Sequence, residues 1–423
     1  MDRKMWHRAL VAALVIVTVT GGATAAAADE AHRLTGADPA HESVGGGVAP
    51  ASTVVALPDL AIAHRLPSGG MNLWRMPLSE LEDGFGQPQL VKTLDFGGFS
   101  YDNSRTIAGD FGDITASDDG TADHLIWHRQ PNGGVLLWAV GGGADTTPRL
   151  WHDLRTGGWS YAASTPMVGD VNGDGWDDLV VTHSTGNRGD TNIWVFPSDG
   201  TRLTAPQHWA TKRSGDSVLP PRFLLGDLSR DGEGRDDVIE VQGDVYRFVG
   251  GTLQSVLQYG AWTSGSLQSY YTDAVFYGPK SAGWSFGSSR QLTGDVTGDG
   301  LIDVVTVHAQ PKGGILVWMH RGCSYDTGTQ YCMEAPVVWQ DLRTGGWSFA
   351  GSRQHLADTD GDGRQDLVSL HSQGGHPGIL VWRHRSTGTG LETPEVMADL
   401  KTGGWSYASS REAVADLYGT FVG

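Results

Sequence analysis

The segment VGDVNGDGWDDLVVTH (168–183) decides the fold, because its pattern returns as LTGDVTGDGLIDVVTVH (292–308) and LADTDGDGRQDLVSLH (356–371). A looser copy, LGDLSRDGEGRDDVIEV (225–241), carries an insertion. The segment AGDFGDITASDDGTADHLIWH (108–128) is a degenerate copy, called the worn copy below, that has lost the spacing of the acidic residues. The spacing of the first aspartates gives a repeat of about 60 residues: 110, 170, 227, 295, 358 and 416. That period is too long for ankyrin or leucine-rich repeats and suits a four-stranded propeller blade.

Each repeat supplies four candidate strands. An apolar strand such as DLVVTH (178–183) follows the acidic loop, and a turn such as PNGG (131–134) leads to a third strand such as VLLWAV (135–140). A fourth strand precedes segments such as DLRTGGWSY (153–161). In the most divergent repeat we expect the third strand at DVYRFV (244–249). Short β-branched and aromatic runs between Gly, Pro and Asn turns are typical of antiparallel strands, and no stretch shows helical periodicity.

The two ends of the repeat array predict how it closes. The first recognisable unit begins at its second strand, PDLAIAH (58–64), and AVADL (413–417) matches a first strand. We therefore expect an all-β, six-bladed β-propeller over residues 56–423, closed by pairing of the N- and C-terminal strands. Closure of this kind removes the exposed edges of an open sheet.

The N-terminal residues predict export. Residues 1–28 combine a basic start, an apolar run of twelve residues (9–20) and an A-x-A cleavage site, which is the pattern of a secretory signal peptide. Residues 29–55 are expected to be a flexible leader, so the mature protein is expected to be extracellular. Export permits a disulfide between Cys323 and Cys332, which flank a turn-forming centre; free reactive cysteines are the alternative.

Composition excludes several classes of partner. Glycine supplies 61 of 423 residues and there are 16 tryptophans, a mixture that indicates a turn-rich β protein rather than a disordered chain. The formal net charge of −18 disfavours nucleic acid, which needs basic clusters to neutralise phosphate. No second apolar run follows the first one, so no membrane insertion is expected.

The acidic loops carry a metal-binding pattern. Oxygen-bearing side chains stand at positions 1, 3, 5 and 9, glycine at position 6 permits a sharp turn, and position 7 is expected to contribute a carbonyl. Alternate side chains on such a loop converge on one Ca²⁺. The expected ligands in the three intact loops are Asp170, Asn172, Asp174, Trp176 and Asp178; Asp295, Thr297, Asp299, Leu301 and Asp303; Asp358, Asp360, Asp362, Arg364 and Asp366. The looser loop offers Asp227, Ser229, Asp231 and Asp237.

An EF-hand is excluded because position 12, where that motif needs Glu, is Val181, Thr306 or Ser369, and strands flank the loop. The loop followed by a DLVVT-type strand resembles the FG-GAP/VCBS repeat of integrin-like β-propellers. The resemblance implies one calcium in each intact loop between strands one and two, giving three to four sites. It departs from the family in two ways: six units are found where seven are frequent, and the loops at Asp110, Asp113 and Asp416 have lost the pattern. We expect the calcium to be structural, although clustered Asp and Gly also form metal-free turns.

The opposite face is a candidate ligand face. It should collect the 2–3 and 4–1 loops, where histidines end the second strands and tryptophans recur in GGWS segments. The candidates are His64, His128, His183, His308, His371, Trp159, Trp284, Trp347 and Trp405, with Phe99 as a weaker equivalent. Aromatic rings beside polar turns can stack on the apolar faces of sugars; the alternative is that these residues pack the blades together.

No catalytic residue is assigned. The string around Ser285 fits a nucleophile elbow, but its siblings in other repeats lack the last glycine, and an elbow belongs between a strand and a helix. The sequence therefore predicts a secreted calcium-binding propeller that acts as a binding or adhesion module for an extracellular glycan or protein. The alternative is a lyase or hydrolase that acts on polysaccharide, since propellers host both kinds of function.

Overall fold

The computed structural model describes residues 58–79, 84–112, 121–185, 190–212, 221–228, 235–249, 252–262, 269–277, 286–324, 331–372 and 378–415. The predicted signal peptide and leader lie outside these ranges. All of these ranges belong to the unit Val54–Gly423. Strands make up nearly all of the regular structure here, so the chain is an all-β protein, as predicted. No helix in the described part of the chain is long and apolar enough to cross a membrane.

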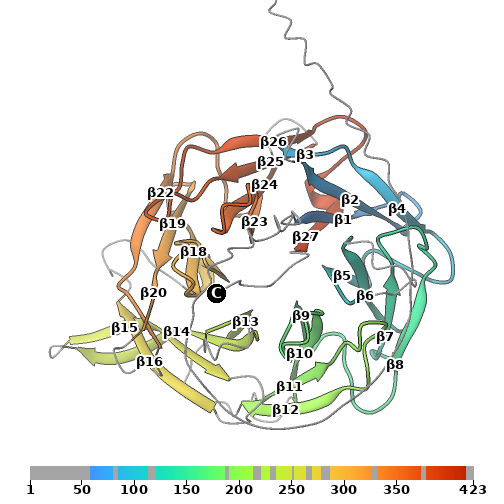
Figure 1. Ribbon diagram of the computed structural model, residues 1–423, viewed down its shortest axis with the longest axis horizontal. Coiled ribbons are helices and arrows are strands. Elements are labelled where there is room, and N and C mark those ends of the chain that lie inside the picture. The colour runs from blue at the N-terminus through green and yellow to red at the C-terminus, as the bar shows by residue number, and fades with distance from the viewer. Residues whose placement is uncertain are drawn as a thin grey trace, which may run out of the picture. The chain divides into compact units, whose positions relative to one another are not determined.

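The repeats fold as antiparallel sheets. Within the described residues five such sheets have four strands in sequence order, and one more joins β27 to β1, β2, β4 and the short β3 (Gly84–Phe85). Figure 1 shows these sheets arranged around a common centre, which is the β-propeller that the repeat predicts. We refer to them as the first to the sixth sheet in the chain order of their second strands.

Equivalent strands occupy equivalent places in every sheet. The innermost strands are β5 (Ser104–Gly109), β9 (Ser164–Gly169), β13 (Arg222–Gly226), β17 (Ser289–Gly294), β23 (Ser352–Ala357) and β27 (Ser410–Ala415). The second strands are β1 (Asp59–Arg65), β6 (Asp123–Arg129), β10 (Asp178–Ser184), β14 (Asp237–Val249), β18 (Asp303–Ala309) and β24 (Asp366–Ser372).

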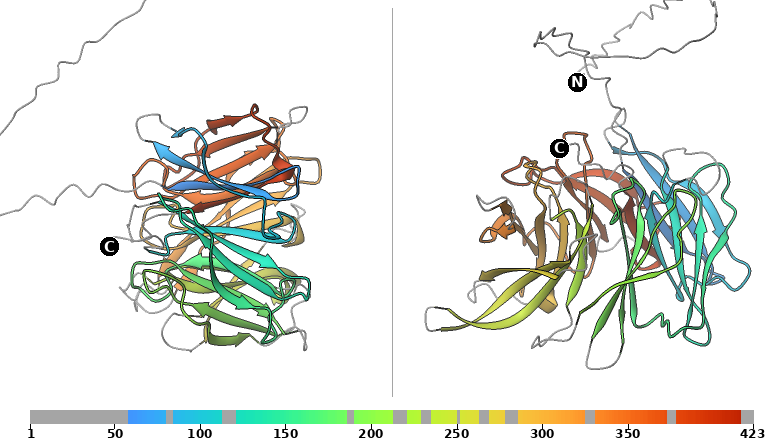
Figure 2. Two further views of the ribbon diagram at one scale, coloured as in Figure 1. Left: turned by 90° about the vertical axis from the view of Figure 1, so that its right-hand side faces the viewer. Right: turned by 60° about the horizontal axis from the view of Figure 1, so that its bottom comes forward.

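The third strands are β2 (Met71–Ser79), β7 (Val135–Val140), β11 (Thr191–Phe196), β15 (Thr252–Trp262), β19 (Ile315–His320) and β25 (Ile379–His384). The fourth strands are β4 (Gln89–Leu94), β8 (Arg149–Leu154), β12 (Gln207–Lys212), β16 (Ser269–Tyr277), β22 (Val337–Leu342) and β26 (Glu395–Leu400). Two 3₁₀ turns, η2 (Phe286–Ser288) and η3 (Tyr407–Ser409), precede β17 and β27. Figure 2 shows the strands crossing the thickness of the unit, so their connections lie on two opposite faces.

One strand assignment from the sequence is wrong. DVYRFV (244–249) is not the third strand of the fourth sheet but the second half of β14, which runs on past Gly243. The pairing of β14 with β15 shifts register between Gln242 and Val245, and such a bulge lets a strand continue through an irregular residue. At this point the repeat has neither the Pro-x-Gly-Gly turn of the first, second and fifth repeats nor the longer glycine-containing segments of the third and sixth, and the long β14–β15 hairpin extends outward (Figure 1).

The first sheet contains strands from both ends of the array. β27 pairs antiparallel with β1, from Asp59 opposite Ala415 to His64 opposite Ser410. The innermost strands of successive sheets are also neighbours, and β27 lies between β23 and β5 in this series. The strand from the C-terminal end of the array therefore lies at the inner edge of β1.

Hydrophobic clusters fill the spaces between consecutive sheets. Leu60 and Met76 of the first sheet, for example, share a cluster with Val368 and Ile379 of the sixth. Because both faces of each sheet are covered, second strands such as β10 are buried along almost their whole length instead of alternating. Packing between repeats, not within one repeat, forms the core.

Arginines on the innermost strands also link the sheets. Five guanidinium groups lie 4.0–4.4 Å from the centre of an aromatic ring of the next sheet: Arg105 on Tyr161, Arg222 on Phe286, Arg290 on Phe349, Arg353 on Tyr407 and Arg411 on Tyr101. Each also donates a hydrogen bond to that next sheet, as Arg411 Nη1 does to the carbonyl of Tyr101 at 2.8 Å. The third sheet has Thr165 at this position, so the series is interrupted there.

A small two-stranded sheet lies outside the repeat pattern. β20 (Gly322–Ser324) pairs with β21 (Tyr331–Met333), and the register places Cys323 directly opposite Cys332. The predicted disulfide would therefore close a short hairpin on the loop between β19 and β22.

Candidate functional site

The acidic loops join the first and second strands, where the sequence placed them. In the β23–β24 loop, Asp358, Asp360 and Asp362 each offer an oxygen within 4.8 Å of the others. The two carboxylate oxygens of Asp358 accept backbone N–H groups from Gly361 at 2.8 Å and Gly363 at 2.9 Å. Both glycines have the positive φ that this turn requires, 73° and 82°. The loop thus wraps around its first carboxylate.

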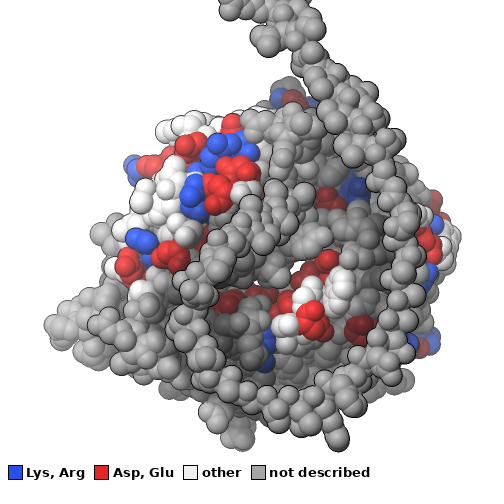
Figure 3. Space-filling model, viewed as in Figure 1, with Lys and Arg blue, Asp and Glu red and all other residues white. Residues whose placement is uncertain are grey.

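The other two intact loops repeat this geometry. Asp170 accepts the N–H groups of Gly173 (2.7 Å) and Gly175 (2.8 Å), and Asp295 those of Gly298 (2.6 Å) and Gly300 (2.8 Å). The residues at position 7 donate their N–H to the carboxylate at position 5: Trp176 to Asp174, Leu301 to Asp299, and Arg364 to Asp362. A compact loop rich in oxygen donors fits a hard cation such as Ca²⁺. In Figure 3 acidic side chains gather near the centre of the displayed face, and basic ones lie beside acidic ones elsewhere.

The carboxylate at position 9 has a second task that the sequence did not reveal. Asp178, Asp303 and Asp366 are fully buried, and each accepts a backbone N–H from the segment after the third strand, at 2.7–2.8 Å. Burial raises the pKa of Asp178 to about 7 and that of Asp303 and Asp366 to about 6. These aspartates tie two loops of the same sheet together.

Sheets without an intact loop keep this aspartate. Asp59, Asp123 and Asp237 begin the second strands of the first, second and fourth sheets and are buried. Asp123 accepts the N–H of Gly142 at 3.1 Å, the same bond that Asp178 makes. Position 9 is therefore an aspartate in all six sheets, including those whose loop lacks the metal-binding pattern, and its role there is structural.

The looser and worn loops are described only in part. Asp227 and Asp237 lie within the described residues, and Asp237 accepts the N–H of Leu228 at 3.0 Å. Ser229 and Asp231 lie outside them. Asp110 is described and accepts the N–H of Gly112 at 3.1 Å, whereas Asp113 and Asp416 lie outside.

Position 8, which the sequence analysis did not single out, connects each loop to the one before it. The backbone N–H of Asp177 donates to the carbonyl of Asp110 at 2.6 Å, that of Asp236 to Asp170 at 2.7 Å, and that of Gln365 to Asp295 at 2.8 Å. The glycine before position 1 is the sequence feature that could have revealed this contact. A Cβ on Gly294 would lie 1.6 Å from Gln365 Oε1, so a side chain there would collide with the neighbouring loop.

The opposite face brings together the predicted histidines and aromatic residues. An aromatic ring from the loop after a fourth strand meets the histidine that ends the second strand of the next sheet, with ring centres 4.8–5.7 Å apart. It also meets a tryptophan of that sheet's third strand, at 5.2–5.5 Å. The four aromatic trios are Trp405, His64 and Trp74; Phe99, His128 and Trp138; Trp159, His183 and Trp194; and Trp347, His371 and Trp382.

The sequence analysis did not single out the third-strand tryptophans, whose pairing with the fourth strand shifts register at the tryptophan itself. His308 and Trp318 occupy the matching places in the fifth sheet, while their expected partner Trp284 lies outside the described residues. The rings of each trio come from two neighbouring sheets, so they also contribute to the packing between those sheets. Trp159, for instance, also contacts Phe196 of the core at 5.5 Å.

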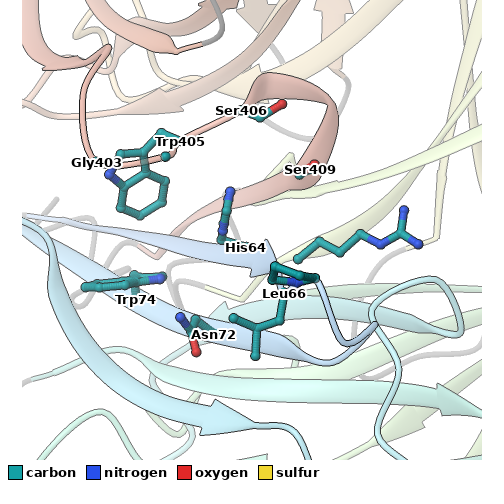
Figure 4. A pocket seen from close by; sticks show the side chains of 11 residues that line it. His64, Leu66, Asn72, Trp74, Gly403, Trp405, Ser406 and Ser409 are labelled. Atoms are coloured by element: carbon teal, nitrogen blue, oxygen red, sulfur yellow. The ribbon is translucent and has the colours of Figure 1, made fainter.

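Two of the trios also border open cavities. One cavity of about 530 Å³ lies beside Trp405, His64 and Trp74, with Arg65 and Asn72 in its lining. Figure 4 shows His64 between Trp405, from the loop after β26, and the β2 side chains Trp74 and Asn72. We call this cavity the first pocket.

The second pocket, also about 530 Å³, occupies the equivalent place one sheet further on. Phe99, His128 and Trp138 line it together with Arg129 and Asn103. Neither lining contains Asp or Glu, so these pockets lack the paired carboxylates of a glycosidase. Equivalent pockets at equivalent places are what a repeated binding site requires.

Buried polar atoms in the trios lack partners within the described structure. Nε2 of His64 and Nε1 of Trp74 are buried and have no hydrogen-bond partner among the described residues, and both residues line the first pocket. The same holds for Nε2 of His371 and Nε1 of Trp382. Burial lowers the pKa of His64 and His371, so these imidazoles are neutral at pH 7 and offer one donor and one acceptor. Such groups suit the hydroxyls of a ligand.

Comparison with known proteins points to one family. The FG-GAP repeat family matches residues 162–196, which contain the 170–178 loop and β9 to β11. No curated protein sequence matches the chain. Similar solved structures include AofleA from Arthrobotrys oligospora, with 11% identity over 85% of this chain and 90% of that one and a TM-score of 0.46. A mutant of the Aleuria aurantia lectin in complex with alpha-methyl-L-fucoside has 10% identity over 82% and 98% and a TM-score of 0.43. Such values carry no information about the ligand of this chain.

Proposed function

Because the chain is an FG-GAP repeat β-propeller protein, we propose that it is a secreted, calcium-stabilised module that binds carbohydrate in pockets between neighbouring sheets. The observation that supports this most is the unpartnered pair His64 Nε2 and Trp74 Nε1 beside the aromatic first pocket. A buried polar atom without a partner is costly, and a hydroxyl-rich ligand would supply one. The aromatic rings offer flat apolar faces to the C–H side of a sugar.

The binding test uses the repetition of the site. Titration of the protein with simple methyl glycosides, or a glycan array, should show several equivalent sites. Trp405→Ala removes one wall of the first pocket and should lower the number of sites by one while thermal unfolding still shows a folded protein. Val337→Ala, an exposed residue of β22, is the matched control and should bind like the wild type. Turnover of a polysaccharide without binding at several sites would instead support an enzyme.

The six sheets are proposed to be the blades of one closed ring. The pairing of β27 with β1 and the neighbouring innermost strands support this arrangement. A ring of this kind presents the aromatic trios at regular intervals around one face. Crosslinking of cysteines introduced at opposed positions of β1 and β27 would trap the closed form, and a failure to crosslink in the folded protein would count against it.

Calcium is proposed to bind in the three intact loops and in the looser loop at Asp227. The convergent oxygens of Asp358, Asp360 and Asp362 support the assignment. Calcium at 100 times its dissociation constant stabilises a folded protein by about 2.7 kcal/mol per site, so chelation should lower the melting temperature. Asp358→Asn should reduce the calcium stoichiometry by one, whereas Asp153→Asn, outside the loops, should not. A melting temperature that changes neither on addition of calcium nor on addition of a chelator would refute the assignment.

Export and the disulfide belong to the same proposal. The basic, apolar and small-residue segments within residues 1–28 support a cleaved signal peptide, and the opposed positions of Cys323 and Cys332 support a disulfide. Mass spectrometry of protein recovered from the culture medium tests both. A mature chain that begins at Asp29 and lacks two hydrogens relative to its reduced form is expected.

A further inference from the structure

The pockets differ at the residue that follows the histidine. It is arginine in the first and second sheets, at Arg65 and Arg129, but it is Ser184, Ala309 or Ser372 in the third, fifth and sixth sheets, and the fourth has Gln242 in place of the histidine. We infer that the second pocket binds a pyranose that carries a carboxylate, with Arg129 as the partner of the acid group. This inference rests on the proposed carbohydrate function and adds the class of sugar.

Arg129 is placed to meet a ligand. It is exposed and lines the second pocket together with Phe99, His128 and Trp138. Its backbone N–H donates to the carbonyl of Asn103 at 2.7 Å, which fixes the chain at the rim. No acidic side chain within the described residues forms an ion pair with its guanidinium. The rim therefore carries one uncompensated positive charge in a protein whose formal net charge is −18.

The first pocket offers the internal comparison. Arg65 holds the equivalent position, but its Nη2 lies 2.9 Å from Oδ2 of Asp102, so an acid group is already present. The pair is exposed, with about half of each side chain accessible, and a ligand would have to compete with Asp102. The first pocket should accordingly show a weaker preference for acidic sugars than the second.

The chemistry of the second pocket suits both parts of such a sugar. A guanidinium presents paired N–H donors that match the two oxygens of a carboxylate. The rings of Phe99 and Trp138 supply the apolar surface for the sugar ring, and the amides of Asn103 and Gln130 lie in the lining for its hydroxyls. Repulsion from acidic groups more than about 8 Å away is screened at physiological salt, so the charge of Arg129 dominates the interaction with a bound carboxylate.

The test compares methyl β-D-glucuronide with methyl β-D-glucoside, which differ only in the acid group, by calorimetric titration and by chemical shifts of labelled tryptophans. A hydrogen-bonded charged group contributes about 1.5 kcal/mol or more, so the glucuronide should bind the second pocket about tenfold more tightly at 0.15 M salt. Arg129→Ser copies the third and sixth sheets and should abolish this preference, so that the ratio of the glucuronide and glucoside affinities falls to about one. Asp102→Asn releases Arg65 and should raise glucuronide affinity at the first pocket.

The outcomes separate the two levels of the proposal. Binding of glucoside with no preference for glucuronide, or an unchanged preference in Arg129→Ser, overturns the inference and leaves the carbohydrate function standing. Binding of neither sugar, nor of any glycan on an array, overturns both. A preference that is lost in Arg129→Ser and kept in the control Arg155→Ser, an exposed arginine outside the pockets, supports the inference.

Discussion

Removal of the Arg353 side chain should destabilise the protein more than removal of its closest structural equivalent. Arg353 Nη1 lies 2.7 and 3.0 Å from the two carboxylate oxygens of Glu412 on β27, whose side chain has no exposed area. Arg290 makes the equivalent contacts one sheet earlier, but its Nη1 donates to the neutral Oε1 of Gln354 at 3.0 Å. Arg353→Met therefore leaves a buried carboxylate without its cation, and Arg290→Met does not.

The size of the difference follows from that charge. Breaking a buried ion pair by removal of one partner costs about 3–5 kcal/mol. Loss of hydrogen bonds between an arginine and neutral groups costs about 1–3 kcal/mol, and both variants also lose the contact with an aromatic ring. We therefore expect Arg353→Met to lower the free energy of unfolding by about 2 kcal/mol more than Arg290→Met at pH 7.

The difference in stability between the two variants should depend on pH, because it comes from the charge of Glu412. Burial raises the pKa of Glu412, and Arg353 opposes that rise. Without Arg353 the folded-state pKa increases further above the unfolded value of about 4.3, so the penalty is absent below that pH and develops as the pH rises. Urea unfolding at pH 4 and pH 7 measures both states, and Glu412→Gln in the Arg353→Met background should restore most of the loss at pH 7. Equal destabilisation of the two arginine variants at pH 7, or a difference that does not change with pH, would refute the reasoning.

Three further predictions concern packing, protonation and the hairpin. Gly294→Ala should lower the free energy of unfolding by about 1–3 kcal/mol, because the new Cβ collides with Gln365. Adding Gln365→Ala should recover most of that loss in a urea titration. If the effects of the two substitutions simply add, the contact is contradicted. Burial lowers the pKa of four histidines to about 3 or 4: His124, His320, His355 and His384. The stability should therefore fall below pH 6.5 by about 1.4 kcal/mol per pH unit for each of them, and His320→Gln should reduce the slope of stability against pH. Reduction of a Cys323–Cys332 disulfide should cost roughly 2–3 kcal/mol, with Cys323→Ser unaffected by reductant.

The strands and loops could be predicted because the same sequence pattern occurs in several repeats. A loop such as 170–178 predicts one turn, and the spacing of its copies gives the length of the repeat. Each element was therefore supported by the equivalent segments of the other repeats. The assignment of DVYRFV (244–249) failed because only Gly243 separates it from the strand before it, and β14 continues past that glycine through a bulge. A single unusual repeat gains no support from its siblings.

The candidate site was predictable only in part, for a geometric reason. His64 and Trp405 recur at matching positions and were found. Trp74 was not, because it belongs to a third strand, and the pairing of that strand with the fourth shifts register between Leu73 and Trp74. The same shift occurs at four further third-strand tryptophans: Trp138, Trp194, Trp318 and Trp382. An irregularity of this kind defeats the simple alternation of faces from which side-chain direction is read.

The pairing of β27 with β1 has a consequence for how the chain folds. β1 is among the first strands to be synthesised, but the strand that covers its inner edge contains residues 410–415. Until those residues emerge, β1 exposes unpaired N–H and C=O groups, which are a template for a strand from another molecule. Contacts of such long sequence separation also form slowly. Refolding at high protein concentration should therefore yield strand-exchanged dimers.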